Sequence, residues 1–156
     1  GGPSQDISIH IRGGFVGLSL GTDRAAMIRA AMEGIAMNLK LSLEELERHT
    51  RLGNEIQFCG GGAKSEIWMQ MFADIFDKVI VKTNIDQDAA SLGAAAIAAK
   101  AAGMMEDYRV ILQLHKRELE CHPREEKVQR YKKLQKIFVH ISDVLADLGD
   151  FMKENW

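Results

Sequence analysis

Apolar residues recur along the chain at spacings that predict the order of its elements. Residues 7–20, ISIHIRGGFVGLSL, mix β-branched and apolar residues with glycines, which predicts an extended segment. Short apolar runs at 55–59 and 78–83 predict two strands. Apolar residues three and four positions apart predict helices in three further stretches. The first helix has Thr22 or Asp23 as its N-cap and ends at the break at Gly53. The other two span residues 65–77 and 87–102.

This alternation of strands and helices predicts an α/β layer with a largely parallel sheet. Residues 105–122 are expected to form a helix followed by a loop. A helix of about 30 residues is expected after Pro123, which suits a first helical turn. Its apolar stripe consists of Val128, Tyr131, Leu134, Phe138, Ile141, Leu145, Leu148 and Met152. The stripe is expected to pack on the flank of the domain or on a partner.

Composition and charge narrow the class of protein. The 156 residues carry a formal net charge of -2, so no basic field predicts nucleic-acid binding. No apolar run is long enough to span a bilayer, and the first residues do not resemble a secretory signal. Two cysteines make neither a disulfide framework nor a zinc site, and Cys59 is interpreted as a buried core residue. A reducing, cytoplasmic setting is therefore expected.

The strand at 55–59 is followed by three glycines, and this turn is the main candidate for chemistry. Residues 60–66 read GGGAKSE, which fits neither the Walker A pattern nor the dinucleotide fingerprint. A glycine turn before a helix still offers free N–H groups and lets a ligand approach the backbone. A tight turn that only needs positive φ explains the glycines equally well. Lys64 either meets a phosphate or is an ordinary exposed lysine.

Other polar residues give weaker signals. Glu33 lies in the apolar half of the first helix, where we expect its side chain to be hydrogen-bonded to a neighbouring turn rather than functional. The five histidines are scattered and show no metal-ligand spacing. No pair of nucleophile and base stands out.

Three segments together resemble one family. RGGFVGLSLGTDRAAMIRAAMEGIAMNLK is similar to its arginine-glycine strand and following helix, GGGAKSEIWMQMFADI resembles its glycine motif, and DQDAASLGAAAIAAKAAG resembles its small-residue helix. They occur in the order and at the spacing of the C-terminal domain of the FGGY carbohydrate kinases, closest to the xylulokinase-like branch. The resemblance runs from about Arg12 to Gly103.

The resemblance implies an actin-like ATPase (ribonuclease H-like) fold and transfer of the terminal phosphoryl group of ATP, with Mg²⁺, to a sugar or polyol hydroxyl. The nucleotide, ATP or ADP, is then expected at Gly60, Gly61, Gly62, Ala63, Ser65 and Glu66. Gly62→Val is expected to weaken ADP binding by blocking its approach. The resemblance places the catalytic aspartate, the sugar site and most Mg²⁺ ligands in the family's N-terminal domain, so no catalytic residue and no metal ligand is assigned here.

The resemblance also implies an organisation. Residues 1–103 are expected to form the nucleotide-binding α/β layer and residues 104–156 a helical extension of the same domain. The domain's first β-hairpin is expected to be absent, which would split the sheet between a strand at 12–20 and the strand at 55–59. The chain is then expected to re-pair its strands, to associate with itself as a homo-oligomer, or to exist only as a piece of a larger protein. By itself the chain is expected to be inactive. The alternative is a non-catalytic actin-like binding or oligomerisation module.

Overall fold

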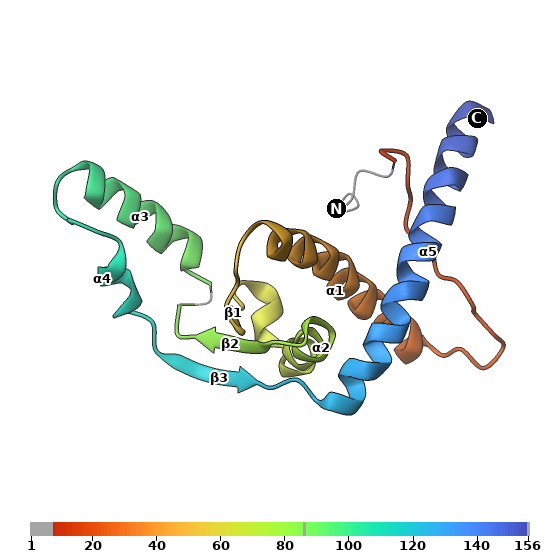
Figure 1. Ribbon diagram of the computed structural model, residues 1–156, viewed down its shortest axis with the longest axis horizontal. Helices are drawn as coiled ribbons and strands as arrows, with labels where there is room; N and C mark the ends of the chain where they lie inside the picture. Colours follow the sequence, from red (N-terminus) through yellow and green to blue (C-terminus); the bar gives the residue numbers. More distant parts are fainter. Residues whose placement is uncertain (1–7, 86, 156) are drawn as a thin grey trace. The chain divides into compact units, whose positions relative to one another are not determined.

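The computed structural model describes residues 8–85 and 87–155, and its chain forms two compact units (Figure 1). One unit joins the parts of the chain up to Leu52 and from Arg124 onward, and the other is Gly53–Pro123. These units do not follow the predicted division at residue 103, which stays a prediction. Within the described residues, no helix is both long and apolar enough to cross a membrane.

The Gly53–Pro123 unit is built on a three-stranded sheet. Its strands β1 (Glu55–Gln57), β2 (Val79–Thr83) and β3 (Arg117–Cys121) lie in the order β1-β2-β3. β1 and β2 are parallel, with Ile56 opposite Ile80, and β2 and β3 are antiparallel. A parallel pair needs a crossover connection, and helix α2 (Glu66–Phe76) provides it.

Helix α2 supplies a larger share of the core of this unit than any other single element. It contacts β2 and β3, and its buried face carries Met69, Phe72 and Ile75. Ile80 and Cys121 are paired across β2 and β3, so they point to one face of the sheet, and both are buried. The pattern of steps of three and four in α2 thus marks the face that packs, as the sequence predicts.

The sheet differs from the predicted one in two ways. Residues 11–19 form neither strand nor helix, and Val16 and Leu18 are exposed. The predicted strand at 12–20 is therefore wrong for this structure, because no described strand lies beside it to complete a ladder. Conversely, the predicted loop before Pro123 contains strand β3, so the sheet is half antiparallel and is not split.

β3 was missed because its sequence, RELEC, is mostly charged. Arg117 Nη2 donates to Glu55 Oε2 at 2.6 Å, and Lys82 Nζ lies 3.4 Å from Glu118 Oε2. These charges of β3 are therefore paired with opposite charges on β1 and β2. Its alternating Leu119 and Cys121 were the only signal of a strand. Charged side chains of this kind are common on edge strands, where they discourage pairing with other chains.

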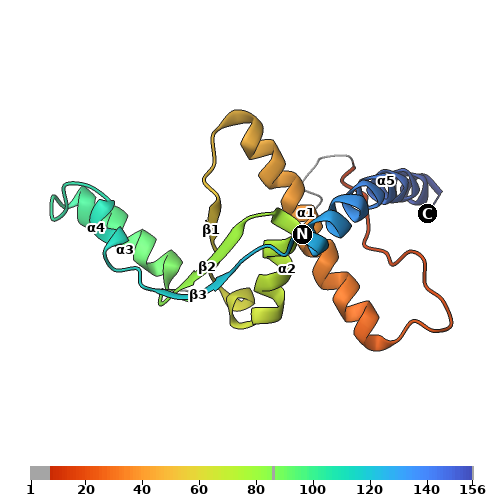
Figure 2. The ribbon, with the colours of Figure 1, turned by 60° about the horizontal axis from the view of Figure 1, so that its bottom comes forward.

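Helix α3 (Ala89–Ala101) lies beside the short helix α4 (Arg109–Leu112) and away from the strands (Figures 1 and 2). Lys100 joins α3 to the connecting loop, since its Nζ donates to the Glu106 carbonyl oxygen at 2.8 Å and lies 5.0 Å from the centre of the Tyr108 ring. Of the α3 residues only Ala96 is buried. Small residues allow a helix to lie close to a sheet, but α3 does not bury its small residues in this way here.

The other unit pairs helix α1 (Arg24–His49) with helix α5 (Glu125–Asn155). Asp23 caps α1, since its Oδ1 accepts from the Ala26 N–H at 2.7 Å, which confirms one of the two predicted caps. α1 ends at His49, before the predicted break at Gly53. α5 has the predicted length, and Pro123 lies two residues before its start rather than in its first turn.

A polar cluster links the two helices. Glu33 Oε1 accepts from the Tyr131 hydroxyl at 2.7 Å and from Arg29 Nε at 2.8 Å, and Arg29 Nη2 donates to the Tyr131 oxygen at 3.1 Å. Farther along, Gln135 Nε2 donates to the Met37 carbonyl oxygen at 3.1 Å. Glu33 is therefore hydrogen-bonded, as expected, with one partner a turn away and the other on α5. The cluster fixes how these helices meet, because buried polar groups need their partners.

Because of this cluster, the free energy of unfolding is expected to fall as the pH becomes alkaline. Burial, and then the hydrogen bond to Glu33, raise the pKa of Tyr131 above its ordinary value near 10. Above pH 10 the unfolded chain has lost this proton while the folded chain keeps it, so stability falls as pH rises. Tyr131→Phe should remove this part of the alkaline slope and cost about 1 kcal/mol at neutral pH. Denaturant unfolding at several pH values checks this, with Tyr108→Phe as control; equal slopes for both variants contradict it.

Candidate functional site

The glycine turn follows strand β1 directly. The Phe58 N–H still donates to the Val81 carbonyl oxygen at 2.8 Å, and Cys59 and Gly60 then leave the sheet. Residues Gly61–Lys64 form a single turn of 3₁₀ helix, η1, before α2 begins. The sequence predicts that the glycines lead directly into the helix, and this prediction is wrong because a turn of 3₁₀ helix lies between them.

Gly60 is required by the backbone. Its φ of 87° and ψ of -169° lie in a region that side chains with a Cβ rarely adopt. An added Cβ would meet no atom within 4 Å, so space is not the reason for this glycine. The alternative that the turn needs positive φ is therefore correct for Gly60.

Gly62 is required by packing. A Cβ built there would lie 3.2 Å from Phe58 Cε1 and 3.4 Å from Trp68 Cε3. Both rings belong to the aromatic group around Phe72, with centroids 4.6 Å and 5.7 Å from the Phe72 centroid. Gly62→Val would thus disturb the turn itself, so it is a poor test of nucleotide approach.

Gly61 is required neither by backbone conformation nor by packing. An added Cβ would meet no atom within 4 Å, and its φ is not in the left-handed region. The fold of this chain therefore gives no reason for a glycine here. A position that is open on the outside of the turn, with no side chain, is where a ligand could approach the backbone closely.

The turn also presents unpaired N–H groups. The Ala63 N–H donates to the Gly60 oxygen at 3.0 Å and the Ser65 N–H to the Gly62 oxygen at 3.1 Å. Within the described chain the N–H groups of Gly61 and Gly62 have no hydrogen-bond acceptor. Successive free N–H groups of this kind suit an anion.

The remaining predicted residues lie at the start of α2. Ser65 is its N-cap, since its Oγ accepts from the Trp68 N–H at 3.3 Å, and this occupies its side chain. The Glu66 carboxyl group is exposed in the first turn, and the Lys64 side chain is exposed too. The side chain of Ala63 is buried, so only its backbone could meet a ligand.

A group of polar residues that sequence reasoning missed lies at the carboxyl ends of β1 and β2. Gln57 Nε2 lies 3.0 Å from Thr83 Oγ1 and 2.9 Å from His115 Nδ1, and Thr83 Oγ1 lies 3.1 Å from the same Nδ1. Because Gln57 can only donate through Nε2, His115 Nδ1 is an acceptor here. The group ties the segment before β3 to the strand ends, and only the pairing of β1 with β2 brings it together.

Other titratable residues have structural roles. The buried Asp74 carboxylate accepts from Gln70 Nε2 at 3.1 Å, and Asp23 is a helix cap. Cys59 is exposed, against the prediction that it is a core residue, whereas Cys121 is buried and burial raises its thiol pKa. Among residues 8–85 and 87–155, no three His, Cys, Asp or Glu side chains gather closely enough to hold a metal ion.

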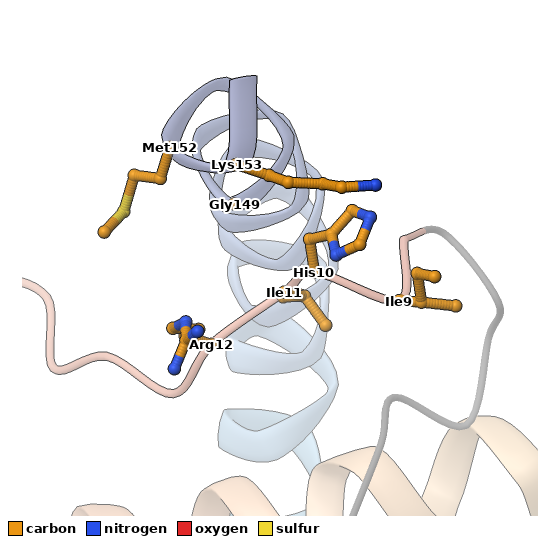
Figure 3. Close-up of a pocket in the computed structure, with 7 residues that line it drawn as sticks. All are labelled: Ile9, His10, Ile11, Arg12, Gly149, Met152 and Lys153. Carbon is orange, nitrogen blue, oxygen red and sulfur yellow. The ribbon is translucent and has the colours of Figure 1, made fainter. Parts of the chain in front are cut away.

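A hollow on the other unit contains none of the predicted site residues. It lies where residues 9–12 cross α5 at Gly149, whose added Cβ would sit 2.5 Å from the His10 carbonyl oxygen. Figure 3 shows Arg12 and Lys153 directed to opposite sides of this crossing. Their charges do not converge on one point, so the hollow is a consequence of the crossing and not a formed anion site.

Comparison with known proteins gives one consistent family. The model of the FGGY family of carbohydrate kinases, C-terminal domain, matches residues 6–102. The chain is 34% identical to a xylulose kinase of Bacillus subtilis, over 97% of this chain and 31% of that protein. It is 32% identical to a gluconokinase of Bacillus licheniformis, over 88% of this chain and 27% of that protein.

Solved structures agree with the sequence matches. The xylulose kinase from Lactobacillus acidophilus superposes with a TM-score of 0.77 and 31% identity, over 88% of this chain and 28% of that one. The chain thus spans about a third of the length of the curated relatives it matches. The shared fold is the actin-like ATPase fold of these kinases, here with a long C-terminal helix. The chain belongs to the FGGY family of carbohydrate kinases and corresponds to its C-terminal domain.

Proposed function

We propose that the chain is the nucleotide-binding part of an ATP-dependent kinase that phosphorylates a hydroxyl group of a sugar or polyol. Gly60, Gly61, Gly62, Ala63, Ser65 and Glu66 are proposed to contact the nucleotide. The observation that carries this proposal is Gly61, whose missing side chain is explained neither by backbone conformation nor by packing. Gly61 also lies within residues 6–102, which match the C-terminal domain of the FGGY carbohydrate kinases, and a nucleotide contact would give a reason for it.

The residues present suit a nucleotide phosphate. The free N–H groups of Gly61 and Gly62 can donate to phosphate oxygens, and the open side of Gly61 gives those oxygens room. Ser65 holds the first turn of α2 in place, so its role is to position the turn. The exposed Glu66 carboxylate can accept hydrogen bonds from ribose hydroxyls.

Bound Mg-ATP would supply the phosphoryl group, and catalysis of such transfers rests mainly on positioning and on stabilising charge. The turn contributes to both, because its backbone donors are held by β1 on one side and α2 on the other. The carboxylates for Mg²⁺, the aspartate base and the sugar pocket are proposed to lie outside this chain. Cytoplasmic location also remains a prediction.

Titration calorimetry of the full-length protein with Mg-ADP tests the site. Gly61→Val should lower ADP affinity at least about tenfold, because its side chain fills the open approach. Its melting temperature should not change, since no protein atom is near. Lys64→Ala is the matched control on the same turn and should bind ADP nearly normally. Unchanged ADP affinity of Gly61→Val would contradict the contact assignment.

Activity tests the wider proposal separately. The full-length protein should release ADP only when a suitable pentulose, sugar acid or polyol is added, and a panel of these identifies the substrate. Residues Gly1–Trp156 alone should not do so, because they are proposed to lack the base that receives the hydroxyl proton. Sugar-dependent ADP release by residues 1–156 alone would refute the proposal that they lack the base. No such release by the full-length protein would refute the proposed kinase activity.

A further inference from the structure

Helix α5 carries apolar residues on two separate faces. One face includes the buried residues Val128, Tyr131, Gln135, Ala146 and Gly149, and it packs within its own unit. The single stripe expected from the sequence therefore divides, because Val128 and Tyr131 are buried while Leu148 is half exposed. The second face consists of residues that are exposed or half-buried in the described chain.

We call this second face the outer stripe. It consists of Leu134, Ile137, Ile141, Val144, Leu148 and Phe151. Ile137, Val144, Leu148 and Phe151 are 56%, 53%, 49% and 62% exposed. Six apolar residues in line on one helix face form a patch of the kind that marks an interaction site.

The spacing of the outer stripe indicates the kind of partner. Its members are separated alternately by three and four residues, from Leu134 to Phe151. A repeat of about 3.5 residues keeps a stripe facing a second helix over several turns, as in a coiled coil. The spacing therefore suits a second helix as the partner.

Charges beside the stripe indicate which helix. The flanking positions are Lys133, His140, Asp147 and Glu154, so the flank is basic toward the start of α5 and acidic toward its end. Two copies of α5 in antiparallel orientation bring Lys133 beside Glu154 and His140 beside Asp147. A parallel pair would place like charges at the same level. The flank is thus complementary to itself only when reversed.

We propose that the outer stripe is an interface between two copies of this chain, whose α5 helices pack antiparallel around a two-fold axis. In this arrangement Ile141 meets Val144 of the second copy, Ile137 meets Leu148, and Leu134 meets Phe151. Each contact occurs twice, as a two-fold axis requires. This inference uses none of the nucleotide-site residues and does not depend on the proposed kinase activity.

Light-scattering measurements on the full-length protein, over a range of concentrations, test the interface. The unaltered protein should be a dimer, and Leu148→Glu should raise its dissociation constant at least about a hundredfold by placing a charge in the apolar seam. Leu112→Glu, which changes the same residue type at a more exposed position on α4, should leave the dimer intact. A monomeric unaltered protein, or a dimer that Leu148→Glu does not weaken, overturns the proposal; the first result would mean that another part of the protein covers the stripe.

Two further variants test the orientation without placing a charge in the seam. Lys133→Glu should weaken the dimer, and adding Glu154→Lys should restore it, because the reversed pair is again complementary. With the exposed Cys59 changed to serine, an oxidised mixture of Ile137→Cys and Leu148→Cys proteins should form a cross-linked dimer. Neither protein should do so alone. Efficient cross-linking of Ile137→Cys with itself would indicate parallel helices and overturn the antiparallel interface.

Discussion

Phe72→Ala is expected to lower the free energy of unfolding by about 3–5 kcal/mol, the range for removing a large buried aromatic side chain. Phe72 is almost fully buried, and its ring lies 4.6 Å from that of Phe58 and 5.2 Å from that of Phe76. The substitution removes the contact between α2 and the end of β1, and it leaves a cavity that neighbouring rings fill only in part.

Ile67→Ala is the matched control, because it removes an apolar side chain from the same helix at an exposed position. Its effect should stay within about 0.5 kcal/mol. Denaturant unfolding followed by tryptophan fluorescence measures both, since Trp68 belongs to the same aromatic group. Similar losses for the two variants would mean that α2 does not bury the face described here.

Gly60→Ala is expected to cost about 1–3 kcal/mol, since alanine must either adopt an unfavourable φ or move the end of β1. The loss should be visible as a lower melting temperature, with or without nucleotide. Gly61→Ala should leave the melting temperature of the nucleotide-free protein unchanged, because neither conformation nor space restricts that position.

The two neighbouring glycines thus separate folding from binding. Gly60→Ala acts on the turn in every state of the protein, whereas bulk at Gly61 should act only when nucleotide is present. Gly62→Ala should fall between them, because the Phe58 and Trp68 rings must move by a few tenths of an ångström. Equal stability of the Gly60→Ala and Gly61→Ala proteins would contradict this division.

Elements with local signals were predictable from the sequence. The cap at Asp23, the buried face of α2 and the length of α5 all follow from side chains near in sequence. The glycine turn was also found, because three successive glycines between a strand and a helix are unusual. Its division of roles was not found, because φ at Gly60 and the rings around Gly62 depend on the folded backbone.

Elements that depend on partners were predicted poorly. Residues 12–20 have the composition of a strand, but a strand forms only where another strand completes its hydrogen bonds. RELEC has the composition of a loop, but it forms strand β3 because it pairs with β2 and because Glu55 and Lys82 interact with its charged side chains. The burial of Cys121 and the exposure of Cys59 follow from which strands pair.

The sequence by itself therefore determined the family, the helices and the place of the glycine turn, because each is encoded in short stretches of neighbouring residues. The tertiary structure decided the strand order, the meeting of Gln57, Thr83 and His115, and the bond between Glu33 and Tyr131. It also decided which apolar face of α5 remains exposed. These features join residues far apart in the chain, and only the packing of whole elements sets such distances.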